Sequence, residues 1–194
     1  MKTLSQLFLT KATQWGALAL ATGVLVSTVQ AVPLNQFVPN KSKITFVSKQ
    51  MGVPVEGKFS QFKVAISLDS DKPEAAKGFV TIELASIDTG SKDGDDEVMG
   101  KNWFDIKKYP QARFDLKSTK NLGAGKIQLN GDLTIKGKTK PLSSIATLKV
   151  NGQSAEMSGD LVFKRMDYAI GEGTWGDVDV VANEVQVHYQ ILMK

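Results

Sequence analysis

Lys126-Ile-Gln-Leu-Asn-Gly-Asp-Leu-Thr-Ile135 alternates apolar and polar residues along its whole length. The large apolar members all fall on one parity, from Ile127 to Ile135, with a single glycine among them. Successive side chains of a β-strand point to opposite faces, so this stretch has one apolar face and one polar face. It is therefore predicted to be a strand whose apolar face lies in a core.

The same alternation recurs in seven further runs of the chain. The eight strands are predicted at about 42–49, 58–69, 78–86, 112–119, 126–137, 142–151, 154–164 and 180–193. An eight-stranded barrel is just wide enough to hold one small ligand. We therefore predict an all-β fold, an eight-stranded antiparallel barrel. Asn151-Gly152 is expected to form a type I′ hairpin turn, which needs positive φ at both central residues.

The segment 91–111 breaks the alternation between the third and fourth predicted strands. Acidic residues open it, which favours a helix N-terminus. Asn102 is a candidate N-cap for a second turn, and Pro110 ends the segment. One or two short helices are expected here, covering one end of the barrel. Their buried side is predicted to consist of Val98, Trp103, Phe104 and Ile106.

The first 31 residues have the pattern of a secretory signal peptide. Lys2 and Lys11 precede an apolar run at 15–26, and small residues follow up to Ala31. The alternative is a membrane anchor, but the run is shorter than the roughly 20 residues that a span needs. We expect cleavage after Ala31, a domain at 32–194 and a soluble periplasmic protein.

Composition excludes several classes of function. Removal of the two leader lysines lowers the formal net charge from +4 to about +2, so no strong field for nucleic acid is expected. The chain has no cysteine, which excludes thiol catalysis and thiolate metal sites. His188 is the single histidine and stands on the polar parity of its run, where a solvated side chain is expected. We predict no metal site and no catalytic cofactor.

The glycine-rich stretch 171–176 precedes the last predicted strand. Glycine-rich loops can hold phosphate, but this one lacks the lysine and the strand–loop–helix setting of a P-loop. The alternative, which we prefer, is a flexible loop with Trp175 packed as an apolar plug.

Several segments match one known family in order. They are Ser42-Lys-Ile-Thr-Phe-Val-Ser48, Gly57-Lys-Phe-Ser-Gln-Phe62, Ala85-Ser-Ile-Asp-Thr-Gly90, Asn102-Trp-Phe-Asp-Ile-Lys-Lys-Tyr-Pro110, Ala112-Arg-Phe114 and Gly131-Asp-Leu-Thr-Ile-Lys-Gly-Lys-Thr-Lys-Pro-Leu142. On these residues the chain resembles the YceI-like family of exported lipid-binding proteins. The resemblance implies a lipocalin-like barrel that holds a long polyisoprenoid chain, such as a prenyl diphosphate or an isoprenoid quinone, in an apolar tube.

Two stretches refine what the resemblance implies. The family often carries arginine and histidine before its aromatic pair, whereas 92–101 is acidic and has no histidine here. A neutral quinone or prenol suits such a lip better than a diphosphate. The ending 171–185 is similar to the branch of the family sometimes joined to a membrane cytochrome b561, which implies a partner of that type and a respiratory quinone.

The inward parity gives the candidate site. Small residues on it, among them Gly131, Ala146 and Gly159, are expected to keep a tube open, although large neighbours such as Phe62, Phe114 and Phe163 could instead fill it. The predicted ligand-binding residues are Phe46, Phe62, Ile66, Ile82, Leu84, Phe104, Phe114, Leu129, Leu133, Ala146, Leu148, Phe163 and Val187.

The leading hypothesis is a non-enzymatic carrier or buffer of an isoprenoid lipid. One alternative is a solid-cored interaction module that regulates a membrane partner. Another is an enzyme that acts on such a lipid, because Asp88, Asp105 and the carboxylates at 93–97 could supply acid–base groups or hold Mg²⁺. A solvated helix start explains the 93–97 carboxylates more simply.

Overall fold

The predicted strand around residue 130 forms as its alternation requires. In the computed structural model, which describes residues 33–69 and 71–194, β8 covers Lys126–Ile135, and its residues alternate between buried and partly exposed. β8 pairs antiparallel with β7 on one side and with β9 on the other. The predicted signal peptide at 1–31 lies outside the described residues.

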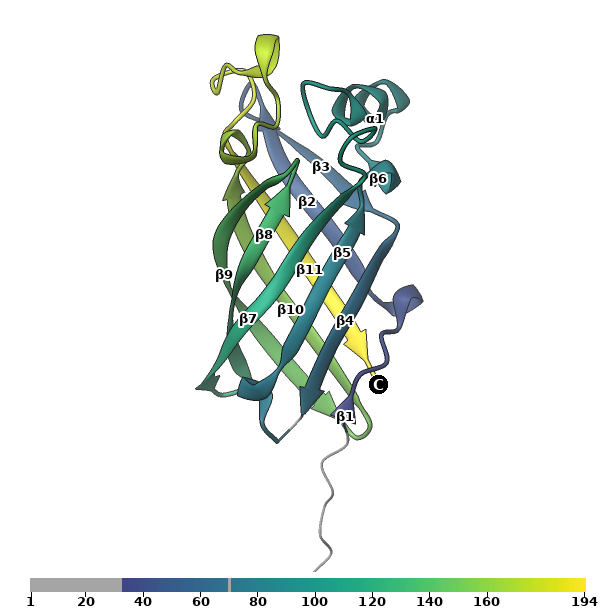
Figure 1. Ribbon diagram of the computed structural model, residues 1–194, viewed down its shortest axis with the longest axis vertical. Helices are drawn as coiled ribbons and strands as arrows, with labels where there is room; N and C mark the ends of the chain where they lie inside the picture. Colours follow the sequence, from purple (N-terminus) through teal and green to yellow (C-terminus); the bar gives the residue numbers. More distant parts are fainter. Residues whose placement is uncertain (1–32, 70) are drawn as a thin grey trace, which may run out of the picture. The chain divides into compact units, whose positions relative to one another are not determined.

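All the strands belong to one antiparallel sheet that curls on itself (Figure 1). Its order is β1-β4-β5-β7-β8-β9-β10-β11-β2-β3-β6. The strands are β1 Pro33–Leu34, β2 Lys43–Gln50, β3 Val53–Phe59, β4 Phe62–Asp69, β5 Lys77–Glu83, β6 Ile87–Asp88, β7 Gln111–Gly123, β8 Lys126–Ile135, β9 Lys138–Asn151, β10 Ser154–Lys164 and β11 Glu184–Met193. The helices are α1 Lys92–Met99 and the 3-10 turns η1 Pro39–Lys41, η2 Pro73–Ala75, η3 Leu84–Ser86, η4 Arg165–Tyr168 and η5 Gly173–Trp175.

The all-β class and the antiparallel pairing are confirmed, but the described residues form eleven strands where eight were predicted. The run predicted at 58–69 is two elements, β3 and β4, which Ser60 and Gln61 separate. β3 pairs with β2 and β6, while β4 pairs with β1 and β5. The other two extra strands, β1 and β6, are only two residues long each.

The chain between Pro33 and Val38 joins β4 to β11. Leu34 pairs with Leu68 of β4 and is 1% exposed. Phe37 bridges Met193 of β11, and Val38 N donates to the Leu192 carbonyl. This segment therefore lies beside the C-terminal end of β11, and β2 pairs with the preceding part of the same strand.

Three two-residue hairpin loops have positive φ at both positions, which suits the right-handed twist of the flanking strands. They are Met51-Gly52, Ala124-Gly125 and Lys136-Gly137. The type I′ turn predicted at Asn151-Gly152 is wrong. Asn151 still pairs with Ser154, so the loop is Gly152-Gln153, and only Gly152 has positive φ.

The predicted helical segment contains one α-helix, α1, followed by turns. Ser91 caps α1, because its hydroxyl accepts a hydrogen bond from Gly94 N, and Asp93 and Asp95 lie in the first turn. The second helical turn expected after Asn102 is not helical. In Figure 1, α1, η4 and η5 lie at one end of the barrel, the helical end, and β1 lies at the other, the β1 end.

Two buried clusters divide the interior along the barrel axis. The larger one includes Leu34, Leu68, Ala146 and Met193 near the β1 end, and several of its other members line the cavity described below. The smaller one packs Tyr168 and Ile170 against strand residues near the helical end, with Trp103, Phe104 and Ile106 partly buried beside it. Among the described residues, no helix has the length and apolar character needed to cross a membrane.

Candidate functional site

A cavity of about 590 Å³ extends from the helical end into the barrel, as far as Ile66, Met157 and Ile191. Inward side chains from most of the strands line it, together with residues of α1 and of the two loops around Trp103 and Trp175. Few of the lining groups are polar. Apolar cavities of this size are typical of small-molecule binding sites.

Ten of the thirteen predicted ligand-binding residues line this cavity. They are Phe46, Ile66, Ile82, Leu84, Phe104, Phe114, Leu129, Leu133, Phe163 and Val187. Phe62, Ala146 and Leu148 do not line it; Ala146 belongs to the larger buried cluster, and Phe62 and Leu148 pack against that cluster.

The small inward residues do not keep the cavity open as expected. A Cβ on Gly131 would lie 2.5 Å from the Phe114 ring, and one on Gly159 would lie 2.5 Å from the Tyr189 hydroxyl. Gly57 is covered in the same way by Phe46, its cross-strand partner. Each glycine thus makes room for an aromatic ring of a neighbouring strand. The cavity lies beyond these rings.

Ser144 and Tyr189 are the buried polar pair of the cavity wall. Ser144 Oγ lies 2.8 Å from the Asp160 carbonyl oxygen and 2.8 Å from Tyr189 Oη. The serine has one proton, which it donates to the carbonyl, so the tyrosine hydroxyl donates to Ser144 Oγ. Burial raises the pKa of Tyr189, which keeps it a neutral donor.

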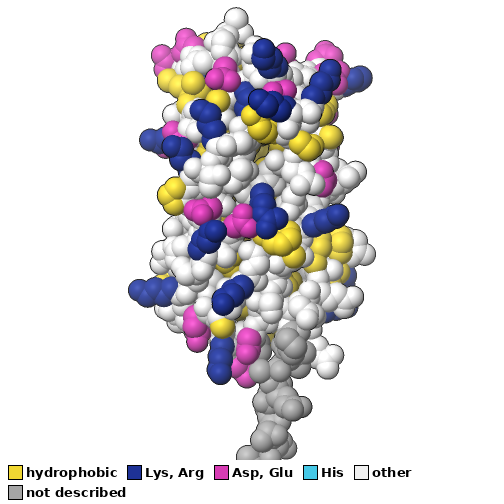
Figure 2. Space-filling view, viewed as in Figure 1, with side chains coloured by type: hydrophobic (Ala, Val, Ile, Leu, Met, Phe, Trp, Pro, Cys, Tyr) yellow, Lys and Arg dark blue, Asp and Glu magenta, His cyan; other side chains and the backbone are white. Residues whose placement is uncertain are grey.

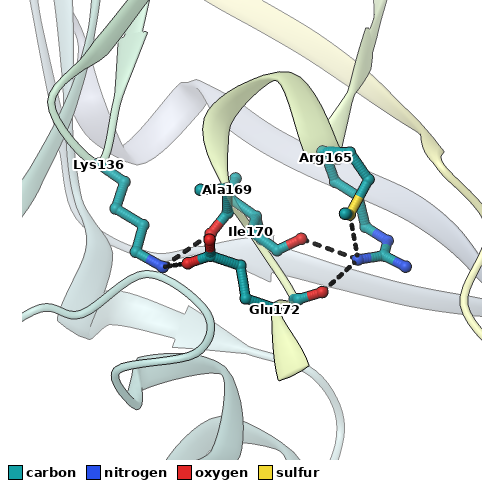
Figure 3. Close-up of polar contacts among 7 residues, drawn as sticks. Lys136, Arg165, Ala169, Ile170 and Glu172 are labelled. Atoms are coloured by element: carbon teal, nitrogen blue, oxygen red, sulfur yellow. Dashed lines mark hydrogen bonds and ion pairs between the residues drawn. The ribbon is translucent and has the colours of Figure 1, made fainter. Parts of the chain in front are cut away.

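Arg165 holds the helical end together, although it is only 1% exposed (Figure 3). Its guanidinium donates to five backbone carbonyls, those of Ile170, Gly171, Trp175, Val181 and Ala182, over 2.7–3.1 Å. The structure assigns no carboxylate to it among the described residues. Burial lowers the pKa of Arg165, although arginine stays charged in proteins.

Two further contacts fix the loop that Arg165 holds. Gly171 has φ +74°, and a side chain there would collide with the guanidinium, so glycine is required. Lys136, whose side chain is 9% exposed, donates to the Ala169 carbonyl (2.7 Å) and pairs with Glu172 (3.0 Å), as Figure 3 shows. The end of β8 is thereby tied to the loop.

α1 and the glycine-rich loop meet over the cavity. Trp175 Nε1 donates to Glu97 Oε1 of α1 at 2.6 Å, and the rings of Trp103 and Trp175 lie 5.7 Å apart. The Asn102 carbonyl accepts from both Gly171 N and Glu172 N at 2.8 Å. Of these residues, Glu97 and both tryptophans line the cavity.

Most of the backbone N–H groups of 171–176 that a phosphate would need are already bonded within the protein. Gly171 N and Glu172 N bond the Asn102 carbonyl, while Trp175 N and Gly176 N bond carbonyls inside the loop. Trp175 instead packs on Trp103 and lines the cavity, as the plug interpretation requires. The loop is therefore part of the cavity wall.

The remaining candidate groups lie apart from the cavity or in its rim. His188 is exposed, and its Nδ1 lies 3.0 Å from Asp160 Oδ1 on the outer face. Asp93 and Glu97 lie at the rim, whereas Asp88 pairs with Lys58 at 3.2 Å. Within 33–69 and 71–194, no three acidic or histidine side chains gather as metal ligands would.

Sequence reasoning missed Arg165 as a residue that shapes the site. The signal was present, because Arg165 continues the inward parity of Leu161 and Phe163, where a charged residue is out of place. Trp103 and Trp175 were expected to be buried, but not to line a shared cavity. The hydrogen bond between Ser144 and Tyr189 was also missed, because it joins two strands that are far apart in the sequence.

Comparison with known proteins identifies the family to which this chain belongs. A family model described as a YceI-like domain matches residues 36–193, so the chain belongs to the YceI-like family, as the resemblance implied. A UPF0312 protein of Pseudomonas syringae pv. tomato is 30% identical over 184 residues, covering 88% of this chain and 95% of the relative. A UPF0312 protein of Pseudomonas putida strain F1 is 34% identical over 143 residues, covering 72% of this chain and 74% of the relative.

Solved structures show the same architecture. Burkholderia cenocepacia BcnA matches with a TM-score of 0.79 and 38% identity, over 82% of this chain and 100% of BcnA. A domain from Saccharophagus degradans matches in fold with a TM-score of 0.65 and 14% identity, over 85% of this chain and 99% of that domain. Its structure is described as that of a polyisoprenoid binding domain implicated in plant cell wall breakdown.

Proposed function

We propose that this protein binds a long-chain isoprenoid lipid in its barrel. The observation that carries the proposal is the apolar cavity of about 590 Å³, enclosed by a fold that the YceI-like family shares. The polyisoprenoid binding domain of Saccharophagus degradans supports the class of ligand, because it has the same fold. A solid-cored interaction module would have no use for such a cavity.

The volume sets the size of the buried part of the ligand. An apolar cavity of about 150 Å³ holds one benzene, so 590 Å³ corresponds to roughly four such rings, on the order of 24 carbon atoms. Burial of about 400 Å² of apolar surface contributes roughly 10 kcal/mol before association and ordering costs are subtracted. No catalytic group or catalytic cofactor is needed for this function.

The rim favours a neutral head group, such as a quinone or a prenol, over a diphosphate. Asp93 and Glu97 line the rim of the cavity and would repel a diphosphate. Arg165 is close by, but backbone carbonyls already occupy its donors. A quinone needs no cationic partner, so these residues accommodate it without rearrangement.

The proposed cellular role is that of an exported carrier or buffer. It would be made with a signal peptide at 1–31 and act in the periplasm as residues 32–194. A membrane protein of the cytochrome b561 type is the proposed partner that delivers or receives the lipid. N-terminal sequencing of the product in its native host tests the first step, and a product that keeps Met1 in the membrane would contradict it.

Mass spectrometry of an organic extract tests the binding function directly. Protein purified under native conditions should release an isoprenoid lipid, and the delipidated protein should take up a prenyl quinone in a saturable titration. If the extract holds no lipid and no titration saturates, the cavity is not a lipid site and the interaction module becomes the better hypothesis.

A further inference from the structure

Trp103 contains an unpaired donor at the cavity. Its Nε1 is buried and has no hydrogen-bond partner among the described residues, where it is the single side-chain atom of this kind. Trp103 also lines the cavity. Buried polar groups in native proteins nearly always have a partner, so an unpaired donor at a binding cavity indicates that the partner belongs to a ligand.

The neighbours of Trp103 cannot serve as that partner. Trp175, whose ring packs against it, already donates its own Nε1 to Glu97 at 2.6 Å. The Arg165 guanidinium is centred 5.9 Å from the Trp103 ring, and it has donors but no acceptor. The Asn102 carbonyl is taken by Gly171 N and Glu172 N.

The charges around Trp103 favour an electron-rich oxygen. Arg165 is buried, and its partners are backbone carbonyls and the Met166 sulfur, so no carboxylate among the described residues cancels its positive charge. An oxygen with partial negative charge beside Trp103 would gain from this charge as well as from the indole N–H. The apolar wall beyond, toward Leu129 and Ile191, suits a hydrocarbon tail.

We propose that Trp103 Nε1 donates a hydrogen bond to a carbonyl oxygen of a quinone head group seated at the helical end, with the tail directed toward the β1 end. This inference rests on the proposed lipid-binding function and adds the residue that recognises the head group. Trp103 is a ligand-contacting residue in this proposal, and Trp175 is its matched control, because Trp175 Nε1 is occupied.

A pair of ligands isolates the hydrogen bond. Phylloquinone has two carbonyls and a phytyl tail, and 2-methyl-3-phytylnaphthalene has the same carbon skeleton without the oxygens. We expect Trp103→Phe to weaken phylloquinone binding about tenfold, the upper range for one net hydrogen bond, and to change hydrocarbon binding less than twofold. Trp175→Phe should change the affinity for both ligands by the same factor.

The outcomes separate this proposal from the function beneath it. If the wild type binds neither compound, the lipid-binding function is wrong and this proposal falls with it. If the wild type binds both and Trp103→Phe weakens both equally, Trp103 merely packs and only this proposal is wrong. Hydrocarbon binding by Trp103→Phe also proves that the variant is folded.

NMR of the indole groups gives a second readout that packing would not move. In ¹⁵N-labelled protein, Trp103→Phe and Trp175→Phe assign the two indole N–H signals. Phylloquinone should shift the Trp103 N–H signal downfield, whereas the oxygen-free analogue should not. Equal shifts with both compounds would overturn the hydrogen bond.

Discussion

Replacement of Arg165 by methionine should detach the glycine-rich loop while leaving the barrel folded. Methionine keeps most of the length and the apolar stem but removes every donor, so five backbone carbonyls lose their partner. An unmet buried hydrogen bond to a charged group costs about 1.5–3 kcal/mol. The sum of five such costs would exceed the free energy that keeps the loop closed. The loop will therefore open, and water will reach the carbonyls.

The free energy of unfolding should therefore fall by about 3–5 kcal/mol, the usual cost of removing one partner from a buried charged site. Urea denaturation measures this change, and an unchanged m-value shows that the folded barrel persists. Hydrogen exchange should speed up at Gly171 N and Glu172 N, which bond the Asn102 carbonyl. Loss of the loop should also weaken lipid binding, because the Trp103–Trp175 contact goes with it.

Arg113→Met is the matched control for this variant. Arg113 pairs with Asp115 at 2.7 Å, but its side chain is 41% exposed, and exposed pairs contribute at most about 1 kcal/mol. The reasoning about Arg165 is refuted if Arg165→Met is as mild as Arg113→Met and the loop amides stay protected. A role in ligand binding alone would produce that result.

Three other predictions concern the cavity, alkaline pH and salt. Leu133→Trp should occupy the cavity and abolish quinone binding, and it should lower the free energy of unfolding by less than about 1.5 kcal/mol. Ala146→Phe should lower the free energy of unfolding by about 1–3 kcal/mol or more, because Ala146 is 0% exposed in the larger buried cluster. Urea denaturation and a quinone titration of both variants test this prediction. Burial raises the pKa of Tyr168 to about 12, above its unfolded value of 10.0, so its contribution to stability is complete below pH 10 and is lost as pH rises toward 12. Tyr168→Phe should flatten that alkaline loss in melts between pH 8 and 12, and an unchanged slope would argue against it. Basic and acidic side chains are mixed over the face in Figure 2, so quinone affinity should change less than twofold between 20 mM and 500 mM salt, and a steep dependence in the titration would reveal a charged ligand.

Period-two alternation predicts this barrel well where a strand has one wet and one buried face. β8 and β10 were placed within a few residues for that reason. β3 was not separated, because Pro54 and Gly57 interrupt its pattern and most of its residues are exposed. No strand was predicted at 33–38, because its backbone hydrogen bonds are made to residues far away in the sequence.

The sequence predicted which side chains of the candidate site point into the barrel, but not which of them border the cavity. Alternation places Phe114 and Leu133 on the inside, yet it cannot tell which inward residues border a space and which pack against each other. Gly131 shows the difficulty, because its missing side chain is replaced by the Phe114 ring rather than by a void. The five carbonyls that surround Arg165 come from three separate segments, 170–171, 175 and 181–182, and no local sequence pattern predicts that they converge.

The pairing of residues 33–42 with β11 has a consequence for how the protein is made. Leu192 N donates to Ser42 Oγ across 150 positions of the chain, and Lys194 exchanges backbone bonds with Gln36. The early strands therefore keep an unpaired edge until the final strand has been synthesised, and contacts of such long range form slowly. Until β11 pairs with it, this bare edge can pair with other chains, so the incomplete chain is prone to aggregate.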